Sequence, residues 1–250
     1  MLRAYNKGNT MHKTVFKFAA SIAAISTLAI SAPAMAQEAE EESSETDPPG
    51  PIDVEVTLAV VSDYRFRGVS LSNKDPAVQP GITVTHESGL YAGVWGSTIA
   101  ENPGSDLEVD LFAGFAGGDI VTYDIGAVYY VYPGVSSFNY AELTGKLGFT
   151  IGPLELGGQV AYAPSQDGTG NQDNIYAATT ASAGLPGTPL TINAGVGFED
   201  GAFGNEKVDW TLGVSAEVEG FSLGAAYVDT NRRVGGLGRA GAVFSISYTF

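Results

Sequence analysis

The sequence contains no cysteine, and this absence removes several classes of site. Without thiols the chain can form neither a disulfide framework nor a thiolate metal centre, and it has no cysteine nucleophile. Charged residues are also scarce, at 16% of the 250 residues, whereas glycine occurs 33 times and tyrosine and phenylalanine 12 times each. This composition is poor in the helix-favouring residues Lys, Glu and Leu and rich in turn and interface residues, so it favours strands joined by turns.

Basic residues are few, and a third of them precede residue 18. Lys13 and Lys17 stand before a short apolar run at 18–30, which is followed by the small-residue triplet Ala34-Met35-Ala36. The run is too short to cross ~30 Å of hydrocarbon as a helix, so residues 1–36 are predicted to be a secretory signal peptide. Removing them leaves 8 basic and 28 acidic residues, a net charge of 8 − 28 = −20. We therefore expect no nucleic-acid partner.

Residues 37–51 are acidic and proline-rich, which predicts a disordered leader before one folded unit at 52–250. From residue 52 onward, runs of about ten residues alternate with clusters of Gly, Pro, Asn, Asp and Ser. No stretch after residue 36 has 18 consecutive apolar residues, so only a β-barrel could carry the mature chain across a bilayer. The twelve predicted strands are 52–66, 77–86, 90–98, 106–116, 120–131, 138–151, 154–163, 174–185, 189–199, 207–219, 221–229 and 239–250.

The connections between these runs alternate in length. Tight turns are predicted at 88–89, 117–118, 152–153, 186–187 and 219–220, and longer polar connections at 68–76, 100–105, 132–137, 164–173, 200–206 and 230–238. Short turns on one side and long loops on the other are typical of outer-membrane barrels, in which the short turns face the periplasm.

The runs also alternate in polarity. In the last run Phe244, Ile246 and Phe250 share one face, and Ser245 and Ser247 share the other. A soluble β-sandwich would show the same alternation and is the competing fold. The final aromatic residue favours the membrane barrel, because it resembles the C-terminal signature that bacterial barrel-assembly machinery recognises. That machinery, through the Phe250 strand, and outer-membrane lipid are the predicted partners.

In the first run, alternation places Tyr64 and Phe66 with the apolar residues, where we expect them at the lipid headgroup boundary. The same alternation places Asp63, Arg65 and Arg67 on the opposite, inward face.

A sequence motif links the chain to a known family. The stretch 62–72, SDYRFRGVSLS, followed by DPAVQP at 75–80, resembles the opening of the TorF family of predicted porins, also described as the Gcw_chp domain. Leu71 departs from the polar residue expected there. The resemblance extends over residues 52–250 and implies an outer-membrane barrel, without naming a solute.

Enzymatic and metal-binding functions have little support. His86 is the single histidine after the predicted signal peptide, and no Gly-x-Ser-x-Gly or His-Glu-x-x-His motif accompanies it. The loop that holds Asp167, Asn171 and Asp173 lacks the spacing of a calcium loop. We predict no enzyme activity, no cofactor and no metal site.

Charges on the face opposite the apolar one would point into a barrel. Buried charges must be paired or hydrated, so they require either a water-filled lumen or an internal ion-pair network, in which Asp63, Arg65 and Arg67 would pair with acids of neighbouring strands and plug the interior. The main hypothesis is a porin that lets small polar solutes or ions diffuse through a narrow, mainly acidic lumen. The alternative is a closed structural or adhesive barrel that binds partners through its long loops. The predicted pore-lining residues are Glu55, Asp63, Arg65, Arg67, Glu108, Asp110, Asp124, Glu142, Lys146, Glu155, Asp209 and Glu217.

Overall fold

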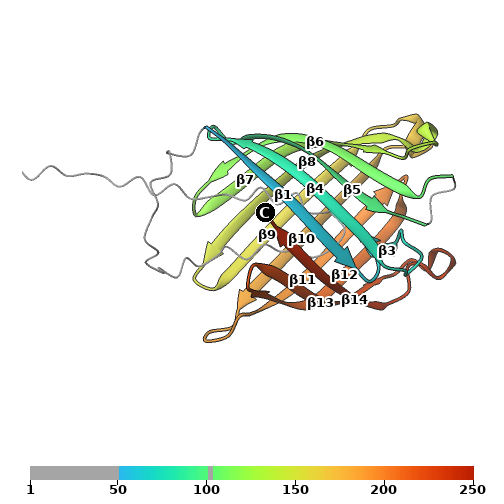
Figure 1. Cartoon of the computed structure of the whole chain (residues 1–250). Helices are drawn as coiled ribbons and strands as arrows, with labels where there is room; N and C mark the ends of the chain where they lie inside the picture. The colour runs from blue at the N-terminus through green and yellow to red at the C-terminus, as the bar shows by residue number, and fades with distance from the viewer. Residues whose placement is uncertain (1–50, 101–103) are drawn as a thin grey trace, which may run out of the picture.

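The computed structural model describes residues 51–100 and 104–250. Within them, twelve antiparallel strands form one closed barrel in the order β1-β14-β13-β12-β11-β10-β9-β8-β7-β6-β5-β4, after which β4 pairs with β1 (Figure 1). The predicted signal peptide, and the predicted leader apart from Pro51, lie outside the described residues. The barrel strands are β1 (Ile52–Val61), β4 (Ala77–His86), β5 (Leu90–Thr98), β6 (Leu107–Gly118), β7 (Val121–Val131), β8 (Tyr140–Ile151), β9 (Leu154–Ala163), β10 (Asn174–Gly184), β11 (Leu190–Gly201), β12 (Gly204–Val218), β13 (Phe221–Thr230) and β14 (Gly241–Thr249).

Short elements complete the fold at the long-loop end. Two-residue strands β2 (Arg65–Phe66) and β3 (Val69–Ser70) pair with each other in a separate small sheet. The described loops also contain three short 3-10 helices, η1 (Ser136–Phe138), η2 (Asp167–Thr169) and η3 (Val234–Gly236). No helix in the described ranges 51–100 and 104–250 is long and apolar enough to span a membrane.

The barrel closes where its first strand meets its last. β1 pairs with β14 from Thr57↔Thr249 to Val61↔Ser245, and the Phe250 amide donates to the Val56 carbonyl at 2.9 Å. All twelve long strands belong to this one closed sheet, and the remaining sheet has only the two short strands β2 and β3, so the alternative of a β-sandwich is wrong.

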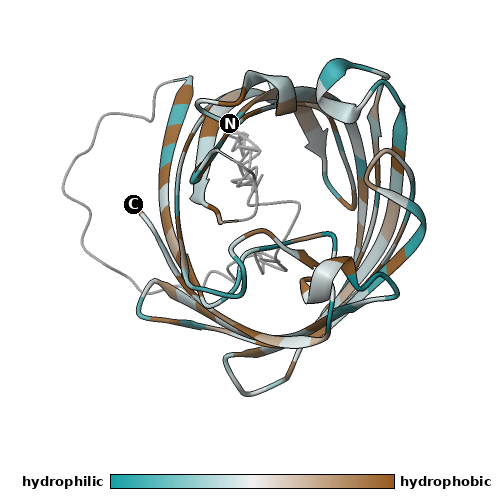
Figure 2. Ribbon diagram, turned by 90° about the vertical axis from the view of Figure 1, so that its right-hand side faces the viewer, coloured by the Kyte–Doolittle hydropathy of each residue, from teal (hydrophilic) through white to brown (hydrophobic). Residues whose placement is uncertain are grey.

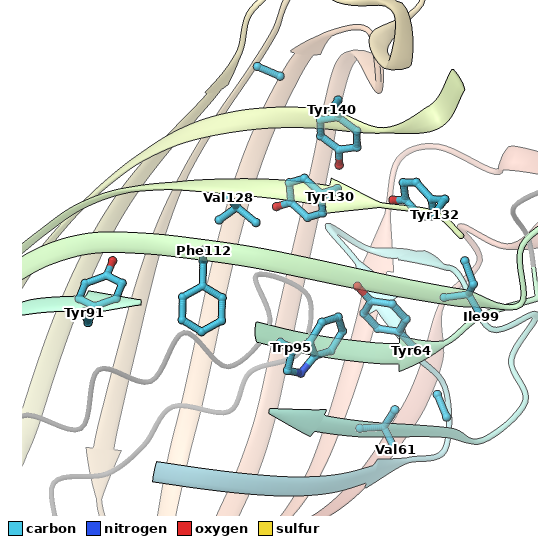
Figure 3. Close-up of a cluster of buried hydrophobic side chains, with 12 residues drawn as sticks. Val61, Tyr64, Tyr91, Trp95, Ile99, Phe112, Val128, Tyr130, Tyr132 and Tyr140 are labelled. Carbon is cyan, nitrogen blue, oxygen red and sulfur yellow. The ribbon is translucent and has the colours of Figure 1, made fainter. Parts of the chain in front are cut away.

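The apolar faces of the strands point outward. Ile125, Leu143 and Phe244 are 60–68% exposed. Buried apolar side chains, such as Val128 and Phe112, belong instead to the cluster inside the ring (Figure 3). Figure 2, which looks along the barrel, shows hydrophobic and hydrophilic residues alternating along the strands. The barrel therefore has the polarity of a protein that is solvated by lipid.

Most strand limits agree with the sequence prediction, and β4, β5 and β9 agree to the residue. One predicted long connection is wrong: residues 200–206 are mostly strand, because β11 continues to Gly201 and β12 begins at Gly204. Contacts from other elements hold this hairpin in place. The Asn174 side chain accepts a hydrogen bond from the Phe203 amide at 3.0 Å, and the Phe203 ring lies 4.8 Å from that of Tyr140.

Candidate functional site: the charged interior of the barrel

Nine of the twelve predicted site residues lie on inward-facing positions of the barrel strands. Each of them has at least one exposed apolar residue beside it in its strand: Glu108, for example, is 1% exposed, whereas Leu107 before it is 41% exposed. That these residues line a water-filled passage stays a prediction. The nine are Glu55 on β1, Glu108 and Asp110 on β6, Asp124 on β7, Glu142 and Lys146 on β8, Glu155 on β9, and Asp209 and Glu217 on β12.

The other three predicted site residues, Asp63, Arg65 and Arg67, are not on a barrel strand. β1 ends at Val61, and residues 62–76, which we call the inner loop, leave the wall and turn into the barrel. The predicted strand 52–66 is therefore too long, and the expected lipid-boundary position of Tyr64 and Phe66 is wrong. Tyr64 is 1% exposed and lies against Trp95 of β5, with ring centroids 5.5 Å apart (Figure 3).

Local ion pairing gives the inner loop its shape. The Arg65 Nε donates to Asp63 Oδ2 at 2.7 Å, and the Ser70 hydroxyl donates to Asp63 Oδ1 at 2.6 Å. These bonds support the hairpin of β2 and β3, whose tip is Gly68 with φ of 85°. A left-handed φ favours glycine because it lacks a Cβ. The chain thus reverses sharply and projects its tip away from β1.

Arg67 joins the tip of the inner loop to two distant strands. Its Nη2 donates to Glu142 Oε2 of β8 at 2.7 Å, and its Nη1 donates to Glu199 Oε1 of β11 at 2.5 Å. The three side chains are fully buried. We call this group the Arg67 bridge. A planar guanidinium suits it, because it can donate to two carboxylates in fixed directions.

The surroundings of the guanidinium keep it charged. Burial by itself lowers the pKa of Arg67, but the carboxylates of Glu142 and Glu199 raise this pKa above its ordinary value. The guanidinium carbon also lies 4.3 Å from the ring centroid of Tyr176 and 4.5 Å from that of Phe66, within the range of cation–π attraction.

Gly197 leaves space for the Tyr176 ring. A Cβ at Gly197 would lie 2.2 Å from the hydroxyl oxygen of Tyr176, so the absence of a side chain there leaves space for the ring. The Tyr176 hydroxyl then donates to Asp209 Oδ1 at 3.2 Å.

The interior is less tightly packed toward the short turns. The Lys146 Nζ lies 3.9 Å from Asp124 Oδ2, and the two side chains are 29% and 15% exposed. Glu155 is half-buried and accepts from the Ser182 hydroxyl at 3.3 Å, whereas Glu217 is exposed. The charged interior therefore has two parts, a fully buried network at the long-loop end and a more solvated, mainly acidic region at the short-turn end.

A family model described as "Bacterial protein of unknown function (Gcw_chp)" matches residues 45–248. The chain belongs to the Gcw_chp family. The resemblance carried by residues 62–80 is thus confirmed at the level of Gcw_chp, while the TorF name stays a prediction. No curated protein matches the chain by sequence.

Several solved porin structures share the fold. The KdgM porin matches with a TM-score of 0.55 at 6% identity, over 78% of this chain and 98% of that chain. The NanC porin matches with a TM-score of 0.52 at 12% identity, over 79% and 99%. A structure of the KdgM porin in complex with disordered oligogalacturonate matches with a TM-score of 0.52 at 7% identity, over 79% and 97%. At such identities the likeness concerns the fold alone.

Sequence reasoning missed several residues of the buried network. Glu199 and Lys207 form an ion pair, and the Asn174 amide donates to Glu199 Oε1 at 3.0 Å. Alternation along the predicted strands 189–199 and 207–219 would have placed both charged residues inward, but each stands at the end of its run. Tyr130, whose hydroxyl donates to Glu142 Oε2 at 3.1 Å, was also missed, although alternation along its strand places it on the inward face.

Proposed function

We propose that this Gcw_chp protein is an outer-membrane channel for the passive diffusion of small polar solutes or ions through a narrow, mainly acidic lumen. The observation that carries the proposal is the inverted polarity of a closed barrel, with apolar side chains outside and charged ones inside. Such a channel makes no covalent bond and needs no cofactor. Its interior would supply shape, water and charge.

Strand length supports a membrane location. The barrel strands have 9 to 15 residues. At a rise of ~3.4 Å per residue and a tilt of ~40°, even nine residues cover roughly the 25 Å apolar band of an outer-membrane barrel. The fold shared with the KdgM and NanC porins agrees with this location. Export through the periplasm and recognition of the Phe250 strand by the barrel-assembly machinery belong to the same proposal.

The charge of the interior bears on the solute. On the inward faces of the strands, acids outnumber the lysines Lys146 and Lys207, which predicts a preference for cations or neutral polar molecules over anions. Oligogalacturonate, present in one KdgM structure, carries many carboxylates. An acidic lumen would repel such a polyanion, so we do not extend that ligand to this chain.

A second candidate function is the closed structural or adhesive barrel. The fully buried Arg67 bridge favours it, because ion pairs without exposure leave no water path beside them. The two candidates differ in one measurable property, which is whether the barrel ever conducts.

Planar-bilayer recording with refolded protein tests the proposal. We expect discrete current steps. Under a salt gradient, the sign of the reversal potential should show that cations pass more readily than anions. Replacing Glu155 and Glu217 by glutamine should move the reversal potential toward zero, since these acids lie in the solvated part of the interior. Glu87→Gln, the same change in an exposed turn, should leave it unchanged. Anion selectivity of the unmodified protein would refute the acidic-lumen proposal.

A further inference from the structure

The inner loop enters the interior of the barrel and reaches strands that do not neighbour β1 in the ring. The Tyr64 hydroxyl donates to Glu108 Oε1 of β6 at 2.7 Å. Beyond it, the Phe66 ring lies 6.0 Å from that of Tyr130 on β7. Figure 2, in which the barrel is viewed along its axis, shows loop segments that lie inside the ring of strands.

The tip of the loop is seated against the opposite part of the wall. A Cβ at Gly68 would lie 2.8 Å from that of Asp209 on β12 and 2.9 Å from that of Thr230 on β13. With the Arg67 bridge to β8 and β11, the loop therefore contacts strands all around the ring. A segment held in this way obstructs the long-loop end of the barrel.

We infer that the inner loop is a displaceable plug, held in the closed position by the Arg67 bridge. This inference rests on the proposed channel function. In the closed state Arg67 ties the loop to Glu142 and Glu199. In the open state the loop tip leaves the wall and the guanidinium is hydrated instead.

Other charges of the loop move with it. Arg65 pairs with Asp63, two residues away, and its Nη1 donates to the carbonyl of Gly68 at 3.3 Å. Outside the loop, this arginine lies beside Gly241 of β14, and its Nη1 donates a hydrogen bond to the Arg239 carbonyl at 2.8 Å in the neighbouring loop 231–240. The hairpin can therefore leave the wall without losing its own ion pair, whereas Arg67 must exchange all of its carboxylate contacts.

The two carboxylates of the Arg67 bridge keep hydrogen-bond donors from the barrel wall when Arg67 leaves. Glu199 retains Lys207 and the Asn174 amide, and Glu142 retains the Tyr130 hydroxyl. Each carboxylate therefore keeps a hydrogen-bond donor, and Glu199 also keeps the cation Lys207, whereas Glu142 loses its cation and is hydrated in the open state. Two satisfied arrangements of the same groups are what a two-state gate requires.

The test compares Arg67→Ala with Lys74→Ala in planar bilayers. Lys74 is an exposed residue of the same loop, so its loss removes the same charge without touching the bridge. Removing one partner of a buried ion pair shifts a two-state equilibrium strongly, and we expect Arg67→Ala to raise the open probability at least about tenfold. The conductance of the open state should match that of the rare openings of the unmodified protein. Lys74→Ala should behave as the unmodified protein.

A second pair of variants keeps the test decisive if Arg67→Ala does not fold, as judged by its migration in unheated gels. Glu142→Gln with Glu199→Gln weakens the bridge from the wall side and should also raise the open probability. In a further variant, a short Gly-Ser linker replaces residues 63–75, and this barrel should conduct continuously.

The outcomes separate the inference from the function. If Arg67→Ala changes the step size but not the open probability, the loop is a fixed constriction and the plug inference is overturned. If only the loop-replacement variant conducts, Arg67 does not hold the plug. If the folded loop-replacement variant carries no current either, the proposed channel function itself fails.

Discussion

The outward face of β12 provides a direct test of which surface meets lipid. Leu212 is 58% exposed and is the ninth of the fifteen residues of its strand, near the middle of the barrel wall. Val218 points to the same side at the end of the strand. The two are six residues apart, which is ~20 Å along the strand and ~15 Å along the membrane normal at a tilt of ~40°. Val218 should therefore lie near the interface when Leu212 lies near the midplane.

The perturbation is an arginine at either position. An arginine on the lipid face of a barrel costs ~2–4 kcal/mol at the midplane and ~0–1 kcal/mol near the interface. Leu212→Arg should therefore lower the equilibrium constant for folding into vesicles by about 30-fold to 700-fold. Val218→Arg should lower it by less than about 6-fold.

The assay is reversible urea unfolding in lipid vesicles, with the folded fraction read from migration in unheated gels. This readout is preferable to fluorescence because Trp210 neighbours Leu212 on the same face. In water, an arginine at an exposed position would change stability by about 0.5 kcal/mol or less. Equal and small effects at the two positions would therefore refute the lipid-facing assignment of the outer surface.

Three further predictions concern the inner loop and the C-terminal strand. Gly68→Val should displace the loop tip, because a side chain there would collide with Thr230 and would hold an unfavourable φ of 85°; faster trypsin cleavage within residues 62–76 would report this displacement. Tyr64→Phe should lower the free energy of unfolding by about 1–2 kcal/mol, since Glu108 loses a buried hydroxyl donor, and an unchanged urea midpoint would contradict the contact. Phe250→Ala should reduce the amount of barrel assembled in cells while refolding from urea into detergent stays intact; normal assembly would argue against the proposed recognition of that strand.

The sequence by itself determined the barrel wall. A strand places successive side chains on opposite sides, so alternation can be read without knowing what the strand pairs with. Positions such as Glu108 and Glu155 could be assigned to the inward face for this reason. Turn residues marked most strand ends, and the aromatic terminal strand favoured a membrane barrel over a sandwich.

Only the tertiary structure decided what occupies the interior. Alternation continues past Val61 through Tyr64 and Phe66, so the local pattern gave no sign that the chain leaves the wall there. The partners of Arg67 stand 75 and 132 residues further along the chain, and closure of the ring brings both to it. A period of two records which side of a sheet a residue faces, but ion pairs across a barrel depend on the register of every strand between them.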